Sequence, residues 1–200
     1  MGIDSGYGVG SLKTGVCTST TRPAVPFDGQ TIYETDTDLV KAYNGTSWLG
    51  VGKIAQVVLG STSTQVTSTS SSLTDTGLTA TITPTSSTSK VLVMVTQNGC
   101  SKTVTDSGNA VLMVLLRGAT AIATGHASGF FMGAQYTNTT TVLTGGTHAI
   151  NWLDSPATTS ATTYKTQFKP NTSPNAISVQ SNQLDTAVNM STIILMEVLA

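Results

Sequence analysis

Beyond Lys53, this 200-residue chain is a long series of short segments in which apolar and polar residues alternate, each ended by turn-forming residues. Almost no window has helical periodicity. The candidate strands cover residues 54–60, 78–83, 90–97, 110–117, 121–124, 130–134, 147–153, 164–169, 177–180 and 191–199. About eight main strands without intervening helices predict an all-β fold, an antiparallel sandwich of the jelly-roll type.

One segment is apolar on both of its faces. In 90–97, Val91, Val93 and Val95 share one face, while Leu92 and Met94 lie on the other. This pattern is typical of a central strand. The segment 110–117 is similar, and Gly118 follows it at once, which disfavours a helix there.

The composition supports this interpretation and excludes some partners. Charged residues make up 10% of the chain, against ~25% in typical soluble domains, whereas β-branched Thr, which suits strands, is abundant. The net charge of −1, scattered along the chain, predicts no nucleic-acid and no membrane partner. The apolar stretches 111–116 and 193–199 are too short to span a bilayer, and the N-terminus does not look like a signal peptide. A surface this poor in charge favours burial in an assembly.

The N-terminal quarter has a different organisation. Residues 1–18 are rich in Gly and Ser, which predicts a flexible arm. Residues 19–52 form a Pro-stiffened lead-in and a small β-hairpin with strands at 32–35 and 39–43. Asn44-Gly45 predicts a tight turn with positive φ at both central positions. Residues 53–200 are then the sandwich domain.

A motif runs through the N-terminal segment. It consists of Thr21-Arg22-Pro23, Pro26, Gly29-Gln30, Ile32-Tyr33-Glu34-Thr35-Asp36-Thr37, Tyr43-Asn44-Gly45 and Trp48. It resembles a segment near the N-termini of tailed-bacteriophage structural proteins, which implies attachment to a virus particle. The candidate attachment residues are Arg22, Pro23, Ile32, Tyr33, Tyr43 and Trp48. An isolated hairpin is marginal in water, so we expect this one to pack on another surface.

The larger region carries further blocks, at residues 76–93, 115–118, 153–164 and 191–198. These are similar to blocks in phage head and tail appendage proteins, and their order resembles the jelly roll of the complement globular head and tumour necrosis factor. The resemblance implies a compact homotrimer.

We find no arrangement of residues that predicts catalysis or a cofactor. His126 and His148 are the only histidines, neither lies in a catalytic motif, and no Gly-x-Ser-x-Gly elbow occurs. Cys17 and Cys100 match no metal-site spacing, and we expect two free thiols.

The densest acidic cluster is Glu34, Asp36 and Asp38. On one face of a strand these carboxylates suit a hard cation such as Ca²⁺. Asp-Thr-Asp is also ordinary turn chemistry between two strands, and both alternatives stay open.

Two charged residues in apolar strands need partners. Arg117 has Asp154 or Glu197 as candidates, inside the sandwich or between subunits, and a solvated turn arginine is the alternative. Glu197 lies between Met196 and Val198 and is expected to be paired or at an edge.

Together these features predict a non-enzymatic protein on the surface of a phage virion. The leading expectation is a trimeric capsid decoration, cement or head-fibre protein that contacts the major capsid protein. The alternative is a tail appendage whose knob binds a host-surface glycan or protein receptor. A soluble carbohydrate-binding module would need exposed aromatic rings, for which Tyr136, Trp152 and Tyr164 are the candidates, although each is expected in the core or at an interface.

Overall fold

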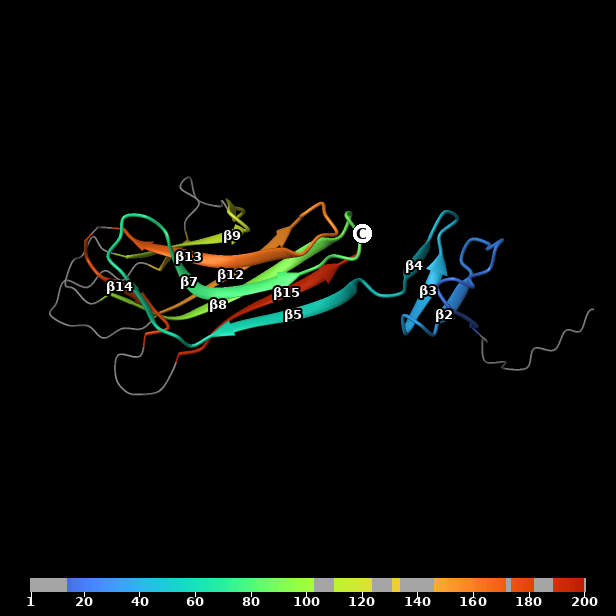
Figure 1. Ribbon diagram of the computed structural model, residues 1–200, viewed down its shortest axis with the longest axis horizontal. Coiled ribbons are helices and arrows are strands. Elements are labelled where there is room, and N and C mark those ends of the chain that lie inside the picture. Colours follow the sequence, from blue (N-terminus) through green and yellow to red (C-terminus); the bar gives the residue numbers. More distant parts are fainter. Residues whose placement is uncertain are drawn as a thin grey trace, which may run out of the picture. The chain divides into compact units, whose positions relative to one another are not determined.

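The computed structural model describes residues 14–102, 110–123, 131–133, 146–171, 174–181 and 189–199. Within these ranges every regular element is a β-strand. The chain divides into two compact units, residues 1–53 and 54–200, which we call the small unit and the large unit. Figure 1 shows the strands of both units. The all-β prediction is confirmed.

The small unit is built on a four-stranded sheet in the order β1-β2-β3-β4. Its strands are β1 (Gly15–Cys17), β2 (Thr31–Glu34), β3 (Leu39–Tyr43) and β4 (Trp48–Gly50). The chain turns back directly from β2 to β3 and from β3 to β4, whereas β1 pairs with β2 in parallel. Residues 15–17, which the sequence predicts to belong to the flexible arm, form a strand instead. The rest of the predicted arm, residues 1–13, lies outside the described residues.

The Asn44-Gly45 turn connects β3 to β4 and differs from the predicted geometry. Gly45 has a φ of +89°, but Asn44 is not in the positive-φ region. Instead, the Asn44 side-chain oxygen accepts hydrogen bonds from the amides of Thr46 (3.0 Å) and Ser47 (2.7 Å). The turn is therefore stabilised by hydrogen bonds to the Asn44 side chain, and only Gly45 of the two predicted residues has the left-handed conformation.

The large unit is a sandwich of two sheets. Its strands are β5 (Ile54–Thr62), β6 (Val66–Ser68), β7 (Thr74–Ile82), β8 (Lys90–Lys102), β9 (Val111–Arg117), β10 (Thr120–Ala121), β11 (Phe131–Gly133), β12 (Gly146–Asp154), β13 (Thr162–Pro170), β14 (Ile177–Val179) and β15 (Ser191–Val198). One sheet has the order β10-β9-β13-β7, with β11 also on β9. The other has the order β5-β15-β8-β14-β6, with β12 also on β8 (Figure 1).

Strand β8 is central, as the sequence predicts. It pairs with β15 on one side and with β12 on the other, and all three strands are antiparallel to their neighbours. Val91, Val93 and Val95 point into the sandwich and are buried. Leu92 and Met94, on the opposite face, are only half-buried in the isolated chain.

The core between the sheets has two apolar clusters with a polar layer between them. One cluster includes Leu78, Ile82, Leu115, Tyr164, Ile193 and Leu195, and the other includes Cys100, Met113, Phe168, Ile177 and Val179. In the polar layer, buried Gln97 donates to Ser191 (3.0 Å) and accepts from Thr166 (3.0 Å), and Thr166 bonds to Thr76 (2.6 Å). Because these polar groups satisfy one another, burying them costs little, and the match specifies which strands face each other.

Candidate interaction surfaces

Arg22, a predicted attachment residue, is used inside the small unit. Its Nε donates to the carboxylate of Glu34, which is fully buried. Glu34 also accepts a hydrogen bond from Thr37 (2.9 Å) and lies 3.8 Å from Lys41 Nζ. The Arg22 guanidinium holds the pKa of Glu34 below its usual range, and Thr37 and Lys41 act in the same direction against burial. Arg22 therefore fastens the segment before β2 to that strand.

Most of the other predicted attachment residues also stabilise the small unit. Ile32 is 1% exposed, so it is a core residue that no partner can reach. Pro23 is half-buried. The rings of Tyr43 and Trp48 pack on each other with centroids 5.3 Å apart. Tyr33 donates its hydroxyl to Asp38 in the turn after β2.

One face of the small sheet is apolar and exposed. Val16 on β1, Tyr33 on β2 and Val40 on β3 lie in one row across the sheet, and the amide of Val51 donates to the carbonyl of Val40 (2.9 Å). Leu49 on β4 lies on the same face, paired with Ala42. Val16 is 70% exposed and Val51 64%. This small-sheet face, formed by Val16, Tyr33, Val40, Leu49 and Val51, includes only one residue that the motif identified, Tyr33.

Asp154 holds the two sheets of the large unit together. It lies at the end of β12 and accepts hydrogen bonds from Arg117 on β9 (2.8 Å) and from the hydroxyl of Tyr164 on β13 (2.7 Å). The sequence left Asp154 and Glu197 as candidate partners of Arg117, and in the structure Arg117 pairs with Asp154. Burial, together with the bond to Asp154, raises the pKa of Tyr164, so its phenol stays a donor.

Glu197 on β15 is fully buried and has several donors. Gln56 donates to it (2.6 Å), as do the backbone amide and the hydroxyl of Thr85 (2.7 Å each). Burial by itself would raise the pKa of Glu197, but these hydrogen bonds outweigh it and hold the pKa below the usual range. Gln56 also donates to the carbonyl of Thr83 (2.7 Å). Glu197 is thus an interior group that ties β5 and the loop after β7 to β15.

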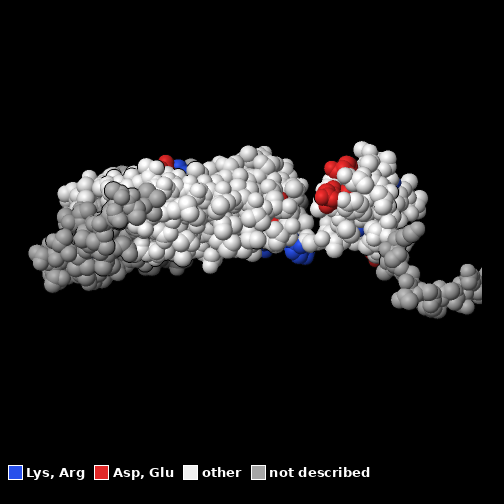
Figure 2. All heavy atoms as spheres, turned by 90° about the horizontal axis from the view of Figure 1, so that it is seen from below, with Lys and Arg blue, Asp and Glu red and all other residues white. Residues whose placement is uncertain are grey.

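The outer face of the larger sheet is a second apolar surface. Two rows cross β5, β15, β8 and β12 side by side: Val57-Met196-Leu92-Leu153 and Leu59-Ile194-Met94-Asn151. Val57, Leu59 and Leu153 are 57%, 65% and 50% exposed. None of the eight side chains carries a charge, and Figure 2 shows few charged atoms over the large unit. We call these eight residues the large-sheet face.

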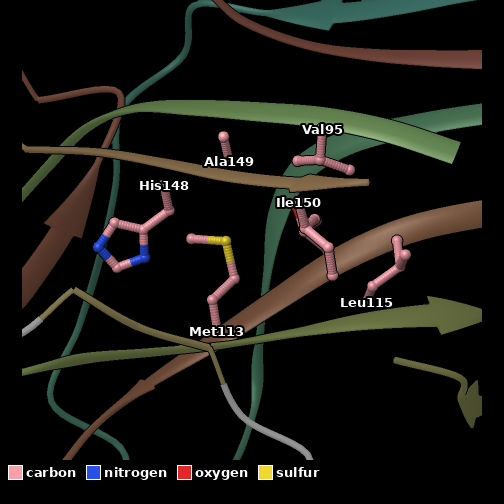
Figure 3. Close-up of a pocket in the computed structure, with 7 residues that line it drawn as sticks. Val95, Met113, Leu115, His148, Ala149 and Ile150 are labelled. Atoms are coloured by element: carbon pink, nitrogen blue, oxygen red, sulfur yellow. The ribbon is translucent and has the colours of Figure 1, made fainter. Parts of the chain in front are cut away.

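His148 lies beside a small apolar cavity between the sheets (Figure 3). The cavity has a volume of about 10 Å³ and is lined by Val95, Met113, Leu115, His148, Ala149, Ile150 and Thr166. The Nδ1 atom of His148 is buried without a hydrogen-bond partner, and burial lowers the pKa of the imidazole. Among the described residues that line this cavity there is no carboxylate that could orient the imidazole as a base. The other histidine, His126, lies outside the described residues.

The three clustered acids of the small unit do not converge on a common point. Glu34 binds Arg22, Asp36 accepts the backbone amide of Ser19 (2.9 Å), and Asp38 accepts from Tyr33. Asp36 and Asp38 lie in the turn between β2 and β3, where Asp38 has a φ of 54°. Of the two alternatives for these acids, a cation site and a turn between two strands, the structure therefore shows the turn. Across the described ranges, no group of three or more His, Cys, Asp or Glu side chains is placed to hold a metal ion.

The aromatic residues considered for glycan binding are not exposed platforms. Tyr164 is fully buried and Trp152 packs against the core, while Tyr136 lies outside the described residues. A cleft of about 170 Å³ opens at an irregularity between β7 and β13. Beside it, Asp75 accepts from Lys165 and Gln167 at 2.9 Å each. Gly77, which has no side chain, also lines this cleft.

The sequence matches no protein-family model and no curated protein. No helix long and apolar enough to cross a membrane occurs in the described parts of the chain. Both cysteines, Cys17 and Cys100, are free thiols, and burial raises the pKa of Cys100 to about 12, which makes this thiol unreactive.

Proposed function

We propose that this chain is a non-enzymatic structural protein on the surface of a tailed-bacteriophage virion. The small unit attaches it to the particle, and the large unit forms a homotrimeric knob or cap on the capsid. The observation that carries the proposal is that each unit has an apolar sheet face with no partner in the described chain. Large exposed apolar patches on a folded protein usually mark interfaces.

The motif around Arg22 supports the phage assignment through its resemblance to virion proteins. Its members have structural roles that depend on one another: Arg22 pairs with Glu34, and Tyr43 packs on Trp48. Because its residues stabilise one another, the motif specifies a folded module, and proteins with different partners can share that module. The module then supplies the fold for attachment, and the exposed residues between the motif positions supply the contact.

The large-sheet face supports a homotrimer. Four strands about 4.8 Å apart, crossed by two rows about 6.8 Å apart, give a face on the order of 300 Å². A stable interface buries ~800 Å² on each partner, so one such face is small for a dimer. In a threefold ring every copy contacts two neighbours through two different surfaces, so the large-sheet face needs to supply only part of the area buried per copy. The two sheet orders also support the finer assignment as a jelly roll.

A tail-appendage adhesin is the second candidate, and the cleft at Asp75 favours it. A carboxylate, an ammonium group and an amide lie together there, partly exposed, and such groups bind sugar hydroxyls. None of the described residues that line the cleft is aromatic. The head-associated role therefore remains our first proposal.

Two measurements test the proposed function. Light scattering coupled to size-exclusion chromatography should give a trimer for the wild type and a monomer for Leu59→Glu, because a buried charge in the large-sheet face opposes association. Leu73→Glu, at an exposed leucine between β6 and β7, is the matched control and should stay trimeric. Labelled antibody against the protein should then bind the heads of intact particles. A monomeric wild type, or label on the tail alone, would contradict the proposal.

A further inference from the structure

The loop from Thr18 to Gln30 presents two large apolar side chains to solvent. Because β1 and β2 are parallel, the chain between them must cross over and cannot turn directly back. Val25, in the middle of this crossover, is 91% exposed, and Phe27 is 67% exposed. These side chains lie among the motif residues, yet no described residue of the small unit covers them. We call Val25-Pro26-Phe27 the apolar tip.

The apolar tip is held in a defined position by its flanks. Before it, Arg22 is paired with buried Glu34. After it, the backbone of Gln30 bonds to the carbonyl of Phe27 (3.0 Å), and the amide of Gly29 donates to Tyr43 on β3 (2.8 Å). The side chain of Gln30 accepts from the amide of Phe27 (3.3 Å).

The prolines restrict the tip further. Pro23 and Pro26 have fixed φ angles, and Val25, which precedes Pro26, is restricted to extended conformations. The loop therefore loses little conformational entropy when its tip is buried. Pre-organised apolar residues of this kind make strong contacts for their size.

We propose that the apolar tip inserts into an apolar pocket on the virion shell protein and provides the main attachment contact of the small unit. This inference rests on the proposed function and names the contact. It assigns the attachment to Val25 and Phe27 in place of buried Ile32 and internally paired Arg22. In a trimer, three tips act together, which multiplies a modest single contact.

The charges around the tip favour a protein pocket over a lipid surface. Asp28 follows Phe27 directly, and Asp28, Asp36 and Asp38 are all exposed. Arg22 and Lys41, by contrast, are engaged with Glu34. Figure 2 shows acidic atoms on the small unit. Anionic lipid headgroups repel such a surface, whereas a pocket in a protein can match it.

The test compares full-length variants for binding to purified phage particles that lack this chain. The double variant Val25→Ser/Phe27→Ser should bind at least about tenfold more weakly than the wild type, because two buried apolar contacts are lost. Leu73→Ser, an exposed leucine in the large unit, is the matched control and should bind like the wild type. Circular dichroism should be unchanged, since the altered side chains are exposed.

A second variant tests pre-organisation separately. Pro23→Ala/Pro26→Ala keeps Val25 and Phe27 but loosens the loop, and should weaken binding by a few-fold. Equal binding by wild type and Val25→Ser/Phe27→Ser would overturn the inference while leaving the proposed function standing. No binding by the wild type would overturn the proposed function and this inference with it. Flotation with vesicles of phosphatidylcholine and phosphatidylglycerol, if it depended on Phe27, would overturn the assignment to a protein pocket.

Discussion

Three acidic side chains lie buried in the described chain, and each has its own set of donors. Glu34 binds Arg22, Asp154 binds Arg117 and Tyr164, and Glu197 accepts from Gln56 and Thr85. A buried carboxylate without such donors would be strongly unfavourable. Because these donors come from different strands and loops, each acid connects parts of the chain that are distant in sequence.

Glu197 gives the clearest prediction at this scale. The pKa of Glu197 is lower in the folded protein than in the unfolded chain. The stability that its hydrogen bonds provide is therefore fully present above about pH 4.5, the ordinary pKa of a glutamate. That contribution is lost as the pH falls through the lower folded pKa. Glu197→Gln should lower the free energy of unfolding by about 2 kcal/mol at pH 7, and should make it less sensitive to pH below 4.5.

Urea denaturation at pH 7, 4.5 and 3.5, followed by circular dichroism, measures both effects. Asp75→Asn is the control, since Asp75 is on the surface and its side chain is 58% exposed. The expectation fails if Glu197→Gln and Asp75→Asn lose equal stability at pH 7.

At the scale of elements, the sandwich depends on the close approach of β5 to β7. A Cβ atom added at Gly60 on β5 would lie 2.1 Å from the carbonyl oxygen of Thr79 and 3.0 Å from Ala80 on β7. The first contact is with a backbone atom and the second is with the Cβ of an alanine, so rotating a side chain relieves neither of them. Glycine is therefore required here by packing, although its φ is ordinary.

Gly60→Ala should destabilise the large unit by roughly 1–3 kcal/mol or more, because the two strands must move apart. Gly146→Ala on β12 is the matched control, since among the described residues the added Cβ would meet only the Cys100 carbonyl oxygen at 3.7 Å, an ordinary contact. Thermal unfolding of both variants measures the difference. Equal melting temperatures would show that β5 and β7 can separate without cost.

At the scale of the whole molecule, the chain is two units joined at Lys53 and Ile54. The joining residues Val51, Gly52 and Lys53 are exposed and form no regular structure. The small unit has one sheet with Ile32 and Glu34 buried, and the large unit has two sheets with the two-cluster core between them. Such units are expected to fold independently.

Limited trypsin digestion tests this independence. Cleavage after exposed Lys53 should release a fragment that begins at Ile54, retains its β-sheet circular dichroism and unfolds at the same temperature as the large unit in the full chain. Lys53→Gln should abolish this fragment. A fragment that unfolds or aggregates on release would mean that the large unit requires the small one.

The contribution of the sequence is clearest in the strands. The alternation of apolar and polar residues is a local property of the sequence. It therefore predicted three strands to within a few residues: β8 from residues 90–97, β12 from 147–153 and β15 from 191–199. The exception is the extension of β8 to Lys102. The sequence offered two candidate partners for Arg117 and none by name for Glu197, because ion pairs and hydrogen bonds of this kind depend on which strands are neighbours in the fold. The parallel pairing of β1 escaped prediction, since three residues carry no usable pattern.

By itself, the sequence determined that this protein is an all-β chain with a central strand near residue 93 and a distinct N-terminal segment. Only the tertiary structure decided which residues are available to a partner. Register across several strands aligns Val57, Met196, Leu92 and Leu153 in one row on the outer face of the sheet, and packing buries Ile32 while leaving Val25 and Phe27 outside. The reason is physical: alternation depends on neighbours two residues apart, whereas exposure depends on contacts between segments far apart in the chain.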